Sequence, residues 1–217
     1  MRTAAVLPVK RFPLAKTRLA PHTGSVLRDD LARAMWADVL DALAACDPLE
    51  TIVVVSREPE VAAAAGHAGA LVVDDGGGEP GQSAAVARGV AAAREHGAER
   101  VVCVPGDCPA LDPGELAALV EQSPAGVTIV PDRHGTGTNA LLLAPPDAIE
   151  PAFGPDSRRR HEALAAAAGV RCTVRAVQSL LFDVDTGEDL AALAAELRAR
   201  DGLAQRTRAV LARAERP

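Results

Sequence analysis

Short apolar runs alternate with longer alanine-rich stretches along the chain, and this alternation limits the fold more than any other feature. Seven runs have the length and the Val/Ile/Leu content of buried strands. They begin at residues 4, 51, 70, 100, 126, 139 and 170 and read AAVLPV, TIVVVS, ALVVDD, RVVCVP, GVTIVP, NALLLA and VRCTVRAV. Strands that are apolar on both faces are typical of a parallel sheet with helices on both sides.

Helical spacing fills most of the gaps between these runs. The clearest helix is predicted from about Ser25 to Ala45, where Leu27, Leu31 and Met35 recur every fourth residue. Further helices are predicted at 58–65, 82–96, 113–121, 157–168 and 187–199. This βαβ order predicts an α/β fold with a three-layer, mainly parallel sheet.

Length and composition predict one soluble domain over residues 1–217, with a C-terminal segment, 202–217, that is expected to fray. The net charge is -6 and the basic residues form no block, so we expect no nucleic-acid partner. No apolar run is long enough for a signal or a membrane span, which favours a cytoplasmic protein without a membrane partner. The four cysteines lack C-x-x-C spacing and are interpreted as reduced core thiols.

The loops that follow strands are the places to look for function, because open parallel sheets bind ligands beyond the carboxyl ends of their strands. After the first strand, KRFPLAKTRLAP carries Lys10, Arg11, Lys16 and Arg18 without the glycines of a dinucleotide-binding or P-loop motif. Two interpretations stay open: a solvated basic loop, or a set of cations that neutralises a polyphosphate.

Aspartates follow apolar runs at two places. Asp107 in VPGDCPAL comes after RVVCV, and Asp183 and Asp185 in LFDVDTGEDL share one face if that segment is extended. Such carboxylates are hard oxygen ligands suited to magnesium that bridges substrate phosphates. The alternatives are that Asp107 caps the helix after Pro113, and that Asp185 with Thr186 caps the helix that follows.

Two glycine-containing segments have features of anion sites. The segment DRHGTGTNALLLA is either a hairpin loop or an anion-binding loop. In the second case, Gly135 and Gly137 leave room for backbone N–H groups and threonine hydroxyls to contact the anion. FGPDSRRRHEAL places Gly154, Asp156 and Ser157 before a helix whose first N–H groups suit a phosphate or carboxylate. The three arginines at 158–160 either reach the same anion or form a solvated helix face.

Five motifs in order resemble the CofC family of guanylyltransferases. They are PVKRFPLAKTRLAP, GDCPAL, GTGTNALL, FGPDSRRRHEAL and DVDTGEDL, and they extend from residue 8 to residue 190. The resemblance implies a nucleotide-diphospho-sugar-transferase-like fold of the molybdenum-cofactor guanylyltransferase type. It also implies GTP as donor, a requirement for Mg²⁺, and a role in making the phospholactyl side chain of the deazaflavin coenzyme. Actinobacterial members of the family are phosphoenolpyruvate guanylyltransferases.

The resemblance assigns binding residues for both substrates. The site for the three-carbon phosphoacid falls on Thr138, Gly154 and Ser157. Gln82 and Ser83 stand where such folds contact the nucleotide base.

The charged groups have assigned roles as well. Lys16 and Arg18, with Lys10, match the basic element that holds the GTP triphosphate. The metal falls on Asp107 with Asp183 or Asp185. Lys16, Arg18 and Asp107 are thus the candidate catalytic residues, and their chemistry is to align two polyanions, with no side-chain nucleophile.

The acceptor is expected to be phosphoenolpyruvate, which attacks the α-phosphorus of GTP and displaces pyrophosphate. The high content of alanine, arginine, glycine and proline favours this actinobacterial version over 2-phospho-L-lactate, and 3-phospho-D-glycerate has the same binding groups. A downstream transferase would then accept the unstable product. Wider alternatives are a molybdopterin or sugar-phosphate nucleotidyltransferase of the same fold and a non-catalytic protein that binds a phosphorylated ligand.

Overall fold

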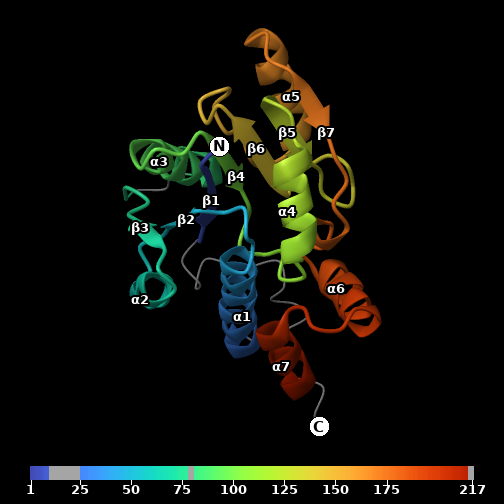
Figure 1. The fold of residues 1–217 in the computed structure, drawn as a ribbon. Coiled ribbons are helices and arrows are strands. Elements are labelled where there is room, and N and C mark those ends of the chain that lie inside the picture. The colour runs from blue at the N-terminus through green and yellow to red at the C-terminus, as the bar shows by residue number, and fades with distance from the viewer. Residues whose placement is uncertain (10–24, 78–80, 215–217) are drawn as a thin grey trace.

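A computed structural model describes residues 1–9, 25–77 and 81–214 of the chain (Figure 1). The strands are β1 (Thr3–Pro8), β2 (Thr51–Val55), β3 (Leu71–Val73), β4 (Arg100–Cys103), β5 (Gly126–Val130), β6 (Ala140–Ala144) and β7 (Cys172–Val174). The helices are α1 (Ser25–Ala44), α2 (Pro59–His67), α3 (Gln82–Glu95), α4 (Pro113–Gln122), α5 (Ser157–Ala167), α6 (Gly187–Ala199) and α7 (Gln205–Ala214), with a 3₁₀ turn η3 (Gln178–Leu180). Every strand and helix that the sequence predicts is confirmed, with small shifts at the ends.

The strands form one sheet in the order β3-β2-β1-β4-β6-β5-β7 within the described residues. The pairs from β3 to β4 are parallel, and so is the pair of β5 with β7. Only β6, of the strands described, runs in the opposite direction, because it pairs antiparallel with both β4 and β5. The start of β6 therefore lies at the same edge of the sheet as the carboxyl ends of the other strands.

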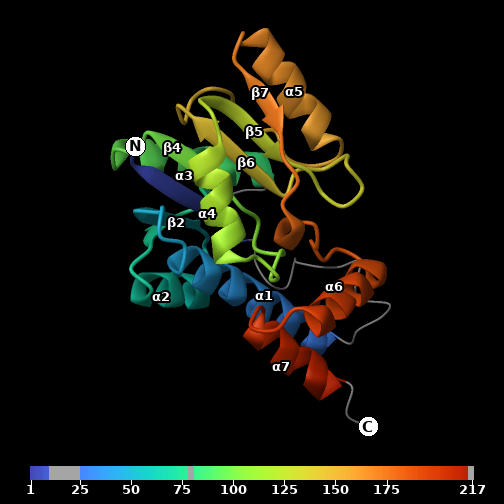
Figure 2. The same ribbon diagram turned by 45° about the vertical axis from the view of Figure 1, so that its right-hand side comes forward.

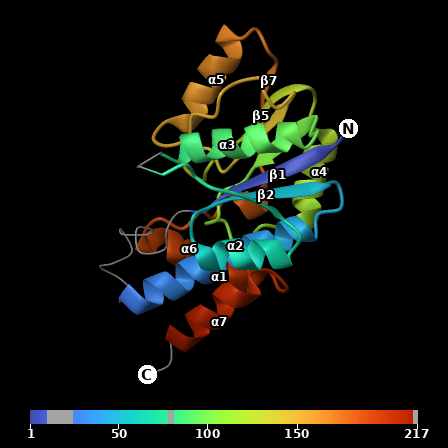
Figure 3. The same ribbon diagram turned by 90° about the vertical axis from the view of Figure 1, so that its left-hand side faces the viewer.

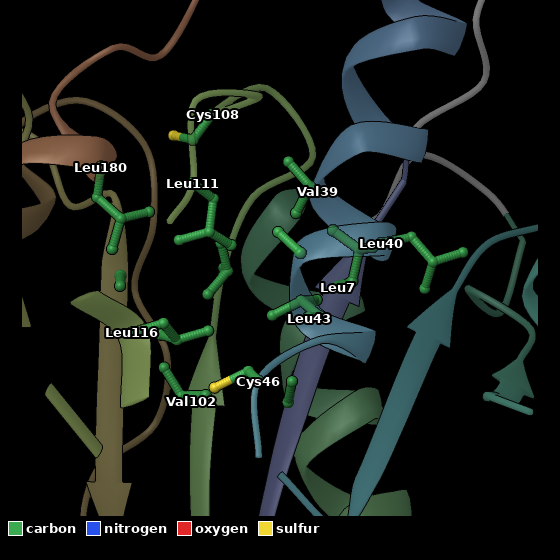
Figure 4. Packing of buried hydrophobic residues seen from close by; sticks show 14 of the residues in the cluster. Leu7, Val39, Leu40, Leu43, Cys46, Val102, Cys108, Leu111, Leu116 and Leu180 are labelled. Carbon is green, nitrogen blue, oxygen red and sulfur yellow. The ribbon is translucent and has the colours of Figure 1, made fainter. Parts of the chain in front are cut away.

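Helices cover both faces of the sheet, which confirms the three-layer α/β class. Alternate residues of β1 point to opposite faces, so Leu7 packs with α1, α2 and α4, whereas Val6 packs with α3. Figure 3 shows α3 on one side of β1 and β2, with α1 and α2 on the other. Figure 4 shows the tightly packed core between α1 and the sheet, where Leu7, Val39 and Leu43 meet.

One glycine brings α3 close to the sheet. A Cβ atom at Gly89 would overlap Val6 Cγ1 and would lie 2.8 Å from Val55 Cγ2. The contact sets how near α3, and hence its first turn, lies to the strands. Three of the four cysteines, Cys46, Cys103 and Cys108, are buried, as expected of core thiols.

The sequence predicts that the C-terminal segment frays, but the structure has a helix there, α7, as far as Ala214. Helix α7 lies against α1, away from α5 (Figure 2), and buries Thr207 and Val210. The buried carboxylate of Asp38, on α1, accepts the N–H of Arg206 at 3.0 Å and that of Thr207 at 2.8 Å. A residue on another helix thus supplies the N-terminal cap that α7 lacks in its own sequence.

No helix in the described part of the chain combines the length and the apolar character that crossing a membrane requires.

Candidate functional site

The carboxyl end of β4 and the start of β6 meet at one edge of the sheet, and the segment between η3 and α6 passes beside them. Val184 N–H donates to the Asp107 carbonyl at 3.1 Å. Asn139 Nδ2 donates to the Leu180 carbonyl at 2.7 Å and to Asp183 Oδ1 at 2.9 Å. Segments that are more than 40 positions apart in the sequence are therefore fixed side by side.

Asp107 follows β4, as the sequence predicts, and it does not cap α4. The cap of α4 is Asp112, whose Oδ1 accepts N–H groups from Gly114 at 2.8 Å and Glu115 at 3.1 Å. The alternative role for Asp107 is thus excluded. Its side chain is half-buried at the edge where Asp183 lies.

The Asp183 carboxyl group has a raised pKa. Burial raises its pKa to about 6, although the hydrogen bond from Asn139 lowers it. The negative charges of Asp107, Asp185 and Asp189 raise this pKa further, in decreasing order. We call Asp107, Asp183 and Asp185 the carboxylate cluster, because the charges of Asp107 and Asp185 both act on Asp183.

Asp185 is exposed, and the cap of the following helix is its neighbour Thr186. Thr186 Oγ1 accepts the Asp189 N–H at 3.3 Å, and Asp189 Oδ2 accepts the Thr186 N–H at 2.7 Å, which is a capping box. Arg133 Nη2 lies 2.5 Å from Asp189 Oδ1. This ion pair ties the loop before β6 to the segment that carries Asp183 and Asp185.

The donor set of the carboxylate cluster fits a hard divalent cation. Its members supply carboxylate oxygens. The pKa of Asp183 is raised first by burial and then by the charges of Asp107 and Asp185, and a cation would offset both effects. Across the described residues, no group of three or more His, Cys, Asp or Glu side chains is arranged to hold a metal ion. The three carboxylates are thus neighbours without being a ready-made three-ligand site.

The predicted acceptor residues Thr138 and Ser157 are brought together, and a third residue, His161, joins them. Ser157 Oγ donates to Thr138 Oγ1 at 3.1 Å, and His161 Nδ1 lies 3.1 Å from the same oxygen. All three are buried, with exposed fractions of 7 % for Thr138, 2 % for Ser157 and 0 % for His161. We call these residues the hydroxyl cluster.

The first N–H groups of α5 are already used within the protein, which differs from their expected role as an anion site. Ser157 N–H donates to the Gly154 carbonyl at 3.1 Å, and Arg158 N–H donates to the Thr136 carbonyl at 3.2 Å. Gly154 has a φ of +110°, a conformation that L side chains rarely adopt. The turn itself therefore requires a glycine at position 154.

The arginines after Ser157 mainly hold the loops in place. Arg158 Nη1 donates to the Gly135 carbonyl at 3.2 Å, and Arg160 Nη2 donates to the Phe153 carbonyl at 2.8 Å. Arg159 is exposed. The solvated-face interpretation suits Arg159, whereas the other two arginines fix the loops on either side of the hydroxyl cluster.

The predicted base-contacting residues open α3. Gln82 is its first residue, and Ser83 Oγ donates to the Phe153 carbonyl at 3.3 Å. Ser83 thus links the first turn of α3 to the loop that carries Gly154. Lys10, Lys16 and Arg18, predicted for the triphosphate, lie outside the described residues.

The sequence motifs give no role to two residues of this site, His161 and Arg133. His161 lies four positions after Ser157, so both occupy one face of α5, and this spacing was the available signal. Arg133 had no comparable signal, because its partner Asp189 is 56 positions away.

Known proteins share this sequence and this architecture. Residues 3–200 match the family described as guanylyl transferase CofC like. A phosphoenolpyruvate guanylyltransferase of Conexibacter woesei is 46% identical over 97% of this chain and 96% of its own length. One from Sphaerobacter thermophilus is 40% identical over 89% of this chain and 93% of its own.

A solved structure from Desulfovibrio desulfuricans G20, assigned as a nucleotide-diphospho-sugar transferase, has the same fold. It gives a TM-score of 0.74 at 18% identity and covers 98% of this chain and 95% of its own. The chain belongs to the CofC family of guanylyl transferases, as its five motifs indicate, and its fold is that of the nucleotide-diphospho-sugar transferases.

Proposed function

We propose that this chain is a phosphoenolpyruvate guanylyltransferase, which transfers GMP from GTP to phosphoenolpyruvate and releases pyrophosphate. The observation that carries the proposal is the dipeptide Thr138–Asn139, which joins the two clusters. Thr138 contacts Ser157 and His161 of the hydroxyl cluster, and Asn139 contacts Asp183 of the carboxylate cluster. An acceptor on one side and a nucleotide on the other would meet across two adjacent residues.

The reaction needs alignment more than it needs a base. An oxygen of the acceptor phosphate forms a bond to the α-phosphorus of GTP, and the bond from that phosphorus to the oxygen bridging to the β-phosphorus breaks. The attacking phosphate is already anionic near neutral pH, so no side chain has to remove a proton. The protein's task is to hold two polyanions in line.

Thr138 and Ser157 serve the acceptor in this scheme, with Gly154 shaping the loop beside them. Hydroxyl donors suit a phosphate or carboxylate, since a hydrogen bond to a charged group is stronger than one between neutral groups. Gln82 and Ser83, in the first turn of α3, would face the nucleotide. The bond from Ser83 to the Phe153 carbonyl connects the two substrate regions.

Magnesium would be held by Asp107 with Asp183 or Asp185. It would supply charge neutralisation for the triphosphate and for the pyrophosphate that leaves. Two carboxylates with substrate phosphates form a usual magnesium environment, which agrees with a cluster that is not a complete ligand set by itself. Asn139, by donating to Asp183, would orient that carboxylate.

Lys16 and Arg18, with Lys10, would hold the triphosphate. They follow β1 in the sequence, and the carboxyl end of β1, which is parallel to β4, lies at the same edge of the sheet as Asp107. Substitution of Lys16 or Arg18 by alanine should then weaken the use of GTP more than that of the acceptor.

We place the reaction in the cytoplasm, in the synthesis of the deazaflavin coenzyme, with hand-over of the unstable product to a downstream transferase. Pyrophosphate release tests the proposal, with GTP and Mg²⁺ and each of phosphoenolpyruvate, 2-phospho-L-lactate and 3-phospho-D-glycerate in turn. We expect the highest kcat/KM for phosphoenolpyruvate. A higher value for another acceptor would correct the substrate, and no release with any of them would overturn the enzyme assignment.

A further inference from the structure

His161 lies at the centre of the hydroxyl cluster, yet neither the sequence motifs nor the proposed reaction gives it a role. Its imidazole is fully buried on α5, and its ring lies edge-on to Phe153, with ring centroids 5.2 Å apart. Burial, and next the charge of Arg160, lower its pKa to about 4. The ring is therefore neutral at physiological pH, with one nitrogen that donates and one that accepts.

The backbone decides which nitrogen carries the proton. The N–H of Ala152 points at His161 Nε2 at 2.8 Å, and an amide N–H can only donate. Nε2 must therefore accept, which leaves the proton on Nδ1. Nδ1 in turn lies 3.1 Å from Thr138 Oγ1, so the imidazole donates to the threonine hydroxyl.

The hydroxyl of Thr138 thus receives two hydrogen bonds. Ser157 Oγ donates to Thr138 Oγ1 at 3.1 Å, and His161 Nδ1–H donates to the same oxygen. A hydroxyl has two acceptor positions and one proton. With both acceptor positions filled, the Thr138 proton remains for an acceptor other than Ser157 or His161.

We infer that His161 is a positioning residue for the acceptor site: by donating to Thr138 Oγ1 together with Ser157, it makes the Thr138 hydroxyl an obligatory donor toward an anionic substrate. The inference rests on the proposed function, because that function assigns the acceptor to Thr138. It also changes the role of Ser157, whose hydroxyl acts through Thr138. The substrate class that fits is a small anion, phosphate or carboxylate, which offers only acceptors to this proton.

The physical benefit is preorganisation. A threonine hydroxyl in water rotates among its staggered positions and donates and accepts equally, whereas here two buried donors fix one orientation before the substrate arrives. The neutral ring brings this about without adding charge. A group that needs to donate to Thr138 is disfavoured, because that hydroxyl has no acceptor position left.

The tautomer can be measured directly in the wild-type protein. We expect the long-range ¹H–¹⁵N spectrum of ¹⁵N-histidine-labelled protein at pH 7 to show a ring protonated at Nδ1 whose signals disappear in the His161→Asn variant, which assigns them to His161. If the signals that disappear in this variant come from a ring protonated at Nε2, the inference is overturned. This measurement needs no substrate, so its outcome does not depend on the proposed function.

Two substitutions separate the role toward Thr138 from the role toward Ala152. Asparagine places an amide N–H near the position of Nδ1, so His161→Asn can still donate to Thr138 while it loses the bond from Ala152. Glutamine reaches the position of Nε2, so His161→Gln can still accept from Ala152 while it loses the donor to Thr138. Each variant keeps one of the two bonds, which makes the pair a matched test.

We expect His161→Gln to raise the KM for phosphoenolpyruvate up to about ten-fold, with the KM for GTP unchanged, because the Thr138 hydroxyl is then no longer held as a donor and its hydrogen bond to the charged acceptor weakens. His161→Asn should stay within about three-fold of the wild type on the same scale. His67→Gln, at an exposed histidine of α2, is the control and should change neither constant. Equal acceptor constants in the two His161 variants would overturn the inference.

Failure of the proposed function looks different. If the wild-type protein releases no pyrophosphate with GTP and any of the three acceptors, the enzyme assignment fails whatever the His161 variants do. If the wild type is active, and Thr138→Val weakens the acceptor while His161→Gln does not, only the role of His161 fails. Thermal unfolding of each variant shows whether it is folded. If neither His161 variant folds, the tautomer spectrum of the wild type decides the inference, because His161, whose pKa is lowered to about 4, is then assigned as the ring that stays neutral at pH 5.5.

Discussion

The carboxylate cluster and the hydroxyl cluster lie on either side of one dipeptide, and their interactions have opposite character. In the hydroxyl cluster, neutral groups of Thr138, Ser157 and His161 satisfy one another through hydrogen bonds of 3.1 Å. In the carboxylate cluster, burial and then the charges of Asp107 and Asp185 raise the pKa of Asp183 to about 6. The first arrangement is favourable in the free protein, whereas the second becomes favourable only when positive charge arrives.

The difference teaches how one sheet edge can serve two substrates. A small acid acceptor needs a site that is formed beforehand, since few contacts hold it. A metal–nucleotide complex brings its own cations and many contacts, so its site can tolerate repulsion in the free protein. Carboxylates that destabilise the free protein would be stabilised by a bound metal–nucleotide complex, and such a trade-off between stability and function is common.

The sharpest test of the comparison removes one charge at Asp107. Asp107→Asn keeps the shape of the side chain but weakens the hold on the metal, so kcat/KM for pyrophosphate release should fall by about 100-fold or more. Asp147→Asn, at an exposed residue paired with Arg94, is the matched control and should keep wild-type activity. Near wild-type release by Asp107→Asn would remove this residue from the metal site.

A smaller effect is expected in the hydroxyl cluster. Ser157→Ala removes one of the two donors that fix Thr138, so the affinity for phosphoenolpyruvate should fall about ten-fold, with little change for GTP. Calorimetric titration of each ligand measures both constants. Unchanged acceptor affinity would mean that Ser157 serves only the start of α5.

The third test concerns stability and pH. The pKa of Asp183 is raised in the folded state from its ordinary value of 3.8 to about 6, so the folded protein binds the proton more tightly than the unfolded chain does. The ionised carboxylate therefore destabilises the fold, by a cost that grows between about pH 4 and pH 6 and reaches about 3 kcal/mol at pH 7. Asp183→Asn removes this cost but also weakens the hydrogen bond from Asn139, so it should raise the free energy of unfolding by about 1 kcal/mol at pH 7.

Urea unfolding of both proteins at pH 7 and pH 4 measures this gain. The difference between Asp183→Asn and the wild type should shrink to nothing at pH 4. A variant that is less stable than the wild type at pH 7 would show that the bond from Asn139 outweighs the repulsion among the aspartates.

The smallest effect is expected from the metal alone. Without nucleotide, Mg²⁺ at millimolar concentration should raise the Tm of the wild type by about 1–2 °C, because the carboxylates supply only part of its ligands. Chelation with EDTA should reverse the shift, and Asp107→Asn should lack it. An equal shift in Asp107→Asn would place the cation elsewhere.

Local patterns in the sequence predict most of the fold, since period-two and period-four spacing depends on neighbours in the chain. The direction of β6 cannot be predicted from such local patterns. The run NALLLA is compatible with a buried strand in either direction, and the loop before it is compatible with a hairpin loop or an anion-binding loop. Only pairing with β4 and β5 decides that β6 runs antiparallel, which brings Thr138 and Asn139 to the edge of the sheet where Asp107 lies.

The site shows the same division. Asp107, Thr138 and Ser157 belong to motifs that a family resemblance can identify from the sequence. The tautomer of His161 depends on the N–H of Ala152, which has no side-chain signal at all. Likewise, nothing local to Asp38 indicates that it caps α7, because the groups it accepts from lie 168 and 169 positions later.

The cap from Asp38 also bears on the order of folding. During synthesis, α1 leaves the ribosome well before α7, so the Asp38 carboxylate cannot accept from α7 until the residues 168 and 169 positions later have been made. Until then, Asp38 and the apolar residues of α1 beneath α7 face water.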